Sequence, residues 1–152
     1  MRRYDARGGA SLELVILAPF LLALLMLIVA FARFTQAKGL VDQAARDAAR
    51  AATAQNSFQG AHTAIDSAVT DALHGAPSSC RESAGVVPDI PQHAFDPVPE
   101  GTTSVDPTQL QSITVTVTCD VDLGDLVILP LGKKPIRFTF TSPMDKYRGY
   151  QR

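Results

Sequence analysis

Glu13 stands out among the ionisable residues because an apolar run follows it directly. Residues 14–32 are nineteen consecutive uncharged residues, LVILAPFLLALLMLIVAFA. An ionised carboxylate at a bilayer costs several kcal/mol unless it is paired or reaches water, so such residues usually mark a function. A position at the membrane interface, two turns from Arg7, is the simpler alternative.

The other potential catalytic groups show none of the spacings that catalysis needs. His62, His74 and His93 do not form an HExxH pair, and the two cysteines do not form a CxxC pair. A GxSxG turn and a phosphate-binding glycine loop are also missing from the sequence. We therefore expect no enzyme activity, no cofactor and no small-molecule substrate, with His62 and His74 on the surface of a helix.

The segment DVDLGD is the nearest approach to a metal site. Asp120, Asp122, Gly124 and Asp125 resemble the start of a calcium loop. A calcium loop also needs later ligands, including a glutamate at its twelfth position, and here residues 130–131 are PL. A polar strand end followed by a turn explains the segment better, so we expect no metal.

Cys80 and Cys119 are the two cysteines of the chain. A pair in a chain with a membrane-insertion signal suggests one disulfide and an oxidising compartment. Closing a loop of this length would stabilise the fold by about 4 kcal/mol in the chain-entropy model. Two buried free thiols are the alternative.

The apolar run is long enough to cross a membrane. Nineteen helical residues span about 28 Å, close to the thickness of the hydrocarbon core. Pro19 removes an amide donor, which predicts a bend in the first turns. A signal peptide cleaved after Ala32 is an alternative, because residues 30–32 (AFA) form a small-x-small site. Lysines and arginines flank the run on both sides, so charge alone does not set its orientation.

The polar residues after the run also have a helical pattern. Residues 34–54 are rich in helix formers and free of proline, which predicts one long helix that leaves the membrane, with Gly39 as its weak point. Alanines recur along it at helical spacing: Ala44, Ala45, Ala48, Ala49 and Ala52. This alanine stripe packs either on the protein's own sheet or on a neighbouring subunit.

The remaining sequence predicts a small domain of class α+β. A second helix is expected over residues 61–74, then a loop over residues 75–108 with at most a short strand near Val86 and Val87. Alternating residues predict a strand over 113–121, with Cys119 on its buried face, and a partner strand over 136–142. We expect an antiparallel sheet packed on the helices.

The charge of the chain argues against one class of partner. The formal net charge is −1, and no long basic run occurs, so the sequence gives no reason to expect nucleic-acid binding.

The start of the chain resembles the prepilin-peptidase site of type IV pilin-like proteins. In those proteins cleavage follows a glycine and a glutamate stands fifth in the mature chain, as Glu13 does when Gly9 is counted first. The continuation ELVILAP, then FAR at residues 31–33 and AARDAAR at residues 44–50, is similar to the TadE-like family of pseudopilins from the Tad, or Flp, pilus machinery. Many relatives carry a second acidic residue just before FAR, where this chain has Ala30.

The resemblance implies a division into three parts. Residues 1–8 would be a basic leader in the cytoplasm, residues 9–34 a transmembrane helix in the inner membrane, and residues 35–152 a pilin-like extracytoplasmic domain. A prepilin peptidase would cut between Gly8 and Gly9, and Glu13 would serve assembly with other pilins or pseudopilins. A single-pass anchored interaction domain unrelated to pili is the alternative.

Overall fold

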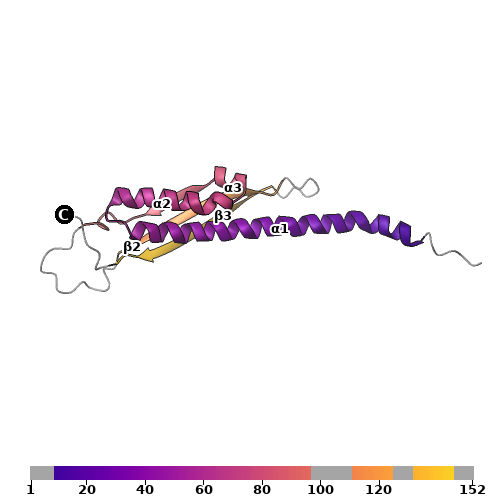
Figure 1. Ribbon diagram of the computed structural model, residues 1–152, viewed down its shortest axis with the longest axis horizontal. Helices are drawn as coiled ribbons and strands as arrows, with labels where there is room; N and C mark the ends of the chain where they lie inside the picture. Colours follow the sequence, from indigo (N-terminus) through magenta and orange to yellow (C-terminus); the bar gives the residue numbers. More distant parts are fainter. Residues whose placement is uncertain (1–8, 97–110, 125–131, 146–152) are drawn as a thin grey trace, which may run out of the picture.

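The computed structural model describes residues 9–96, 111–124 and 132–145, and its fold is α+β as predicted. One helix, α1, runs without interruption from Gly9 to Thr53. Its C-terminal half packs in the domain and its N-terminal half projects away from it (Figure 1). The predicted continuation of the apolar helix into the polar domain is therefore confirmed. The helix passes through both Pro19 and Gly39.

The second helix, α2, spans Phe58–Ala72 and packs against α1. It begins three residues earlier than predicted because Ser57 caps it: the Gly60 amide donates to Ser57 Oγ at 3.1 Å. Its buried face contains Ala61, Ile65 and Val69, one helical turn apart. A 3-10 turn, η1 at Leu73–Gly75, ends the segment, so the predicted C-terminal end at His74 lies in this turn.

Three strands form one antiparallel sheet in the order β1-β2-β3. They span Gly85–Asp89, Ser112–Asp122 and Lys133–Pro143. The short strand expected near Val86 and Val87 and both longer strands are confirmed. The partner strand was expected over residues 136–142, whereas β3 begins at Lys133, and Lys133 and Lys134 pair with Asp122 and Val121.

The alternating pattern of β2 divides the sheet into two faces. The predicted inward residues are all buried: Ile113, Val115, Val117, Cys119 and Val121. They form one core with the buried residues of α1 and α2. On the outer face Thr114 pairs with Thr141 and Thr116 with Thr139, each through hydroxyls 2.9 Å apart.

A short helix, α3 at Ser78–Glu82, lies where a loop was predicted. The pairing of β1 with β2 ends at Gly85 and Thr118, and beyond this point α3 lies along the same edge of β2. The amide of Asp120 donates to Ser83 Oγ at 2.8 Å, and that of Asp122 to Ser79 Oγ at 3.0 Å. The segment folds in this place because its serine hydroxyls accept hydrogen bonds from backbone amides of β2 that do not pair with β1.

Candidate functional site

The N-terminal half of α1 presents a large apolar surface that nothing in the described structure covers. Leu14 and Val15 are each 69% exposed, and large apolar side chains stay exposed as far as Phe31. The helix is long and apolar enough to cross a membrane, and its apolar window is hardly buried. Because a core helix of a water-soluble domain would be covered by protein, this exposure indicates an apolar environment outside the chain.

Glu13 lies at the start of this surface, in the second turn of α1, and its side chain is exposed. Among the described residues it has no hydrogen-bond or ion-pair partner. The nearest bases in the sequence before it, including Arg7, lie outside the described residues, as does Gly8. Gly9 is the first residue of α1, four residues and therefore about one turn before Glu13.

The C-terminal half of α1 contains the alanine stripe, and all five of its alanines are fully buried. They belong to the core with α2 and the sheet, so the structure places the stripe inside its own domain. At the edge of this contact Lys38 Nζ lies 5.9 Å from the centre of the Phe138 ring, and Arg46 Cζ lies 5.7 Å from that of Phe140. Both rings are half-buried and pack against the core.

A disulfide joins Cys80 of α3 to Cys119 of β2, with the Cα atoms 4.8 Å apart. It closes a segment of 39 residues and fixes α3 on the inner face of the sheet. Together with the two serine hydrogen bonds, it makes α3 a bridge between the end of α2 and β2. This disulfide agrees with the alternating pattern of β2, which placed Cys119 on the buried face of the strand.

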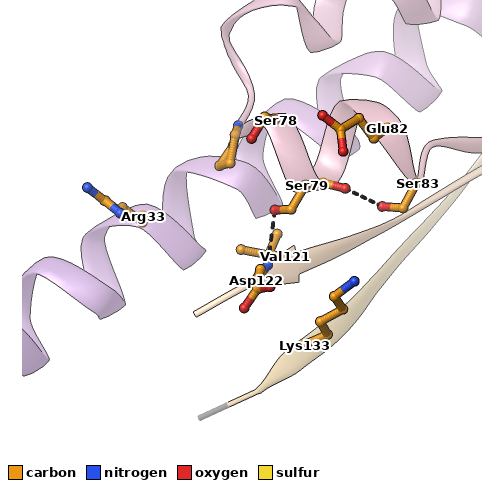
Figure 2. Close-up of a pocket in the computed structure, with 9 residues that line it drawn as sticks. Arg33, Ser78, Ser79, Glu82, Ser83, Val121, Asp122 and Lys133 are labelled. Atoms are coloured by element: carbon orange, nitrogen blue, oxygen red, sulfur yellow. Dashed lines mark hydrogen bonds between the residues drawn. The ribbon is translucent and has the colours of Figure 1, made fainter. Parts of the chain in front are cut away.

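A polar cleft of about 470 Å³ lies beside this bridge (Figure 2). Its lining comes from α1, α3, β2 and β3 and carries charges of both signs: Arg33, Glu82, Asp122 and Lys133. Asp122 Oδ1 accepts a hydrogen bond from the Gly124 amide at 2.7 Å. This bond closes the turn at the end of the strand that was expected here instead of a calcium loop. Asp125 of that segment lies outside the described residues.

Two of the histidines make structural contacts that do not form a shared site. The His62 ring packs against that of Phe58 with centroids 4.7 Å apart and the planes tilted by 57°, and His93 Nδ1 lies 2.6 Å from Asp96 Oδ2. Within the described ranges no three His, Cys, Asp or Glu side chains are grouped so that they could hold a metal ion. Neither the polar cleft nor α3 was visible in the sequence, since both depend on contacts between distant segments.

A family model described as TadE-like protein matches residues 8–50. Over this segment the chain is similar to the TadE-like family. The match covers 43 of the 152 residues, somewhat more than a quarter, and includes the start of α1, the apolar surface and most of the alanine stripe. Searches of curated proteins and of solved structures gave no match.

Proposed function

We propose that this protein is a minor pseudopilin that takes part in the assembly or structure of a Tad/Flp pilus after a prepilin peptidase removes residues 1–8. The observation that carries the proposal is the apolar N-terminal half of α1, which lies in the TadE-like segment, exposes large apolar side chains and has one carboxylate at its start. In this role α1 anchors the chain in the inner membrane. The domain that follows lies outside the cytoplasm, where an oxidising compartment maintains the disulfide.

Glu13 is the assembly residue in this mechanism. Cleavage after Gly8 leaves a positive amino group on Gly9, one turn from Glu13. A second subunit that inserts beside the first brings its own amine to the Glu13 carboxylate. The pair neutralises two charges that would each be costly in an apolar bundle. Because only one longitudinal register brings the two groups together, the pair would also select the alignment of neighbouring helices.

The partners of this function are the membrane, the peptidase and other pilins or pseudopilins of the same machinery. The role is structural and requires neither a cofactor nor a catalytic residue of this chain. The alanine stripe contributes by joining α1 to its own domain, since its side chains are already buried there. Contacts with neighbouring subunits would then fall on the exposed large residues of the N-terminal half.

Substitution of Glu13 tests this mechanism. We expect Glu13→Ala to leave cleavage after Gly8 intact and to reduce incorporation into the pilus strongly, because the incoming amine loses its partner. Glu82→Ala is the matched control, since it also removes an exposed carboxylate, but from α3 of the domain and not from the apolar part of α1. Immunoblots of sheared pili and of membranes measure both variants. Parental incorporation of Glu13→Ala would contradict the assembly role.

The N-terminal sequence of the protein purified from its native membrane tests the processing step. A chain that begins at Gly9 supports the pseudopilin pathway. A chain that begins at Met1 or Arg2 would instead favour an ordinary anchored interaction domain, and one that begins at Arg33 a secreted domain. α1 continues without a break across residues 30–33 into the core, which supports the uncleaved helix over the secreted form.

A further inference from the structure

The end of the β2–β3 hairpin lies against the apolar part of α1. We call Leu123, just after β2, and Lys134 of β3 the hairpin end. They line a shared groove with Leu27, Ala30, Phe31 and Phe34 of α1. These four residues recur at spacings of three and four, so they form one face of the helix. Leu123 is only 9% exposed and Ala30 only 3%, although its neighbour Phe31 is 66% exposed.

This contact places the hairpin end at the level of the membrane boundary. Residues 14–32 of α1 reach about 28 Å, so a span centred on them has its outer edge near Ala32. The face that the hairpin end contacts begins at Leu27, more than one turn before that edge. The domain therefore does not stand clear of the bilayer when α1 spans it, and the hairpin end reaches the depth where acyl chains meet headgroups.

The groove between these elements has a volume of about 250 Å³, and its lining is apolar apart from Lys134. It is continuous with the exposed apolar surface of α1, which is the surface that meets the hydrocarbon in a membrane. An apolar groove with one cation at its margin matches a phospholipid: the wall takes an acyl chain, and the ammonium group takes the phosphate. A lysine at this depth buries its stem and extends its charged end to the headgroups.

The neighbouring polar cleft supplies further charges at the same end of the domain (Figure 2). It contains the bases Arg33 and Lys133 but also the acids Glu82 and Asp122, so it offers no net attraction for an anion. Lys134, in contrast, shares its groove with apolar residues.

We propose that the groove formed by the hairpin end and residues 27–34 of α1 binds a membrane phospholipid, with an acyl chain on its apolar wall and the phosphate at Lys134. The inference rests on the membrane-anchoring part of the proposed function, and it does not require pilus assembly. It makes the sheet domain a second point of membrane contact, which would fix the tilt of the domain on α1 and hold it against the bilayer before assembly.

Spin labels measure the depth of the hairpin end in the full chain. The described cysteines are both in the disulfide, and the sequence contains no others, so one introduced cysteine is the single labelling position. Lys134→Cys reports the hairpin end and Phe20→Cys reports the span. Thr139→Cys is an exposed control five residues further along β3, about 17 Å away. The protein is placed in nanodiscs of phosphatidylcholine with one fifth phosphatidylglycerol.

We expect the label at residue 134 to collide with oxygen in preference to a water-soluble nickel reagent, as the label at residue 20 does. The label at residue 139 should show the opposite preference. If the labels at residues 134 and 139 behave alike and both favour the nickel reagent, the hairpin end does not reach the lipid and the proposal is overturned. If the label at residue 20 also favours nickel, membrane anchoring fails as well, which separates the two failures.

A matched pair of lysine substitutions tests the phosphate contact. Lys134→Gln removes the cation of the groove, whereas Lys133→Gln removes an adjacent cation that lines the polar cleft. Delipidated protein in detergent is titrated with short-chain phosphatidylglycerol, and binding is followed by native mass spectrometry. We expect Lys134→Gln to bind about five-fold more weakly, the change expected from losing one lysine at a charged membrane surface. Equal weakening by Lys133→Gln would overturn the assignment of the phosphate to Lys134.

Discussion

The two halves of α1 belong to one continuous helix but differ in the size and exposure of their side chains. In the N-terminal half leucine, isoleucine and phenylalanine are exposed, whereas the alanine stripe in the C-terminal half is fully buried. Small side chains let α2 and the sheet approach the helix closely. Each large side chain left in water forgoes about 1.5–3 kcal/mol of burial free energy, so the N-terminal half needs an apolar environment from outside the chain.

The comparison also separates two kinds of stability. The C-terminal half of α1 depends on tertiary packing, since its alanines contribute only when α2 and the strands cover them. Apart from the contact of Leu27 and Ala30 with the hairpin end, the N-terminal half has no such cover in the described structure, and its helix depends on its own backbone hydrogen bonds and on its surroundings. A change in the domain core should therefore affect one half and spare the other.

Removal of the disulfide is the largest expected effect. Replacing both Cys80 and Cys119 by alanine should destabilise the domain by about 4 kcal/mol, because the closed segment of 39 residues regains its freedom in the unfolded chain. Hydrogen exchange of the full chain in nanodiscs, followed by mass spectrometry, measures the result. Amides of β2 should exchange faster, while those of residues 14–30 keep their protection. Faster exchange in both regions would show that the two halves of α1 are not independent.

Adding volume to each half is the second test. Ala48→Leu inserts a large side chain into the closed contact between α1 and its neighbours, and it should cost about 1–3 kcal/mol. Ala32→Leu is the matched control, since Ala32 is exposed on the same helix. We expect a lowered thermal midpoint of the domain for Ala48→Leu and little change for Ala32→Leu. Similar midpoints for the two variants would mean that the stripe does not form a close contact.

The elements that follow a regular pattern could be predicted from the sequence. The long helix was predictable because residues 14–54 are rich in helix formers, with only Pro19 near the start and Gly39 acting against the helix. The strands β2 and β3 were predictable because their apolar residues alternate. The site residues of the N-terminal segment, Glu13 above all, came from the resemblance to a family, which the family model supports over residues 8–50.

Contacts between distant segments could not be predicted. The helix α3 is five residues long and serine-rich, and it forms because Ser79 and Ser83 meet the free edge of β2 and Cys80 meets Cys119. The contact between Leu123 and residues 27–34 of α1 depends on how far the hairpin extends along the helix. Local sequence patterns do not show how close α3 lies to β2, or how close Leu123 lies to residues 27–34 of α1.

Gly39 joins the two halves, and its substitution is the smallest expected effect. A Cβ atom added at Gly39 would meet no atom within 4 Å, so Gly39→Ala should stabilise the helix by up to about 1 kcal/mol through its higher helix propensity. Gly60→Ala is the matched control in α2. There the added Cβ would lie 2.9 Å from Ser57 Oγ, which accepts the Gly60 amide, so the gain in propensity is offset by a weakened cap.

Thermal denaturation of both variants in the same detergent measures this difference. We expect a raised midpoint for Gly39→Ala and an unchanged or lowered midpoint for Gly60→Ala. If Gly39→Ala stabilises the isolated protein yet lowers its incorporation into pili, the glycine allows motion between the membrane half and the domain half. If it stabilises the protein and incorporation is unchanged, α1 acts as one rigid rod through the junction, and the two halves differ only in what surrounds them.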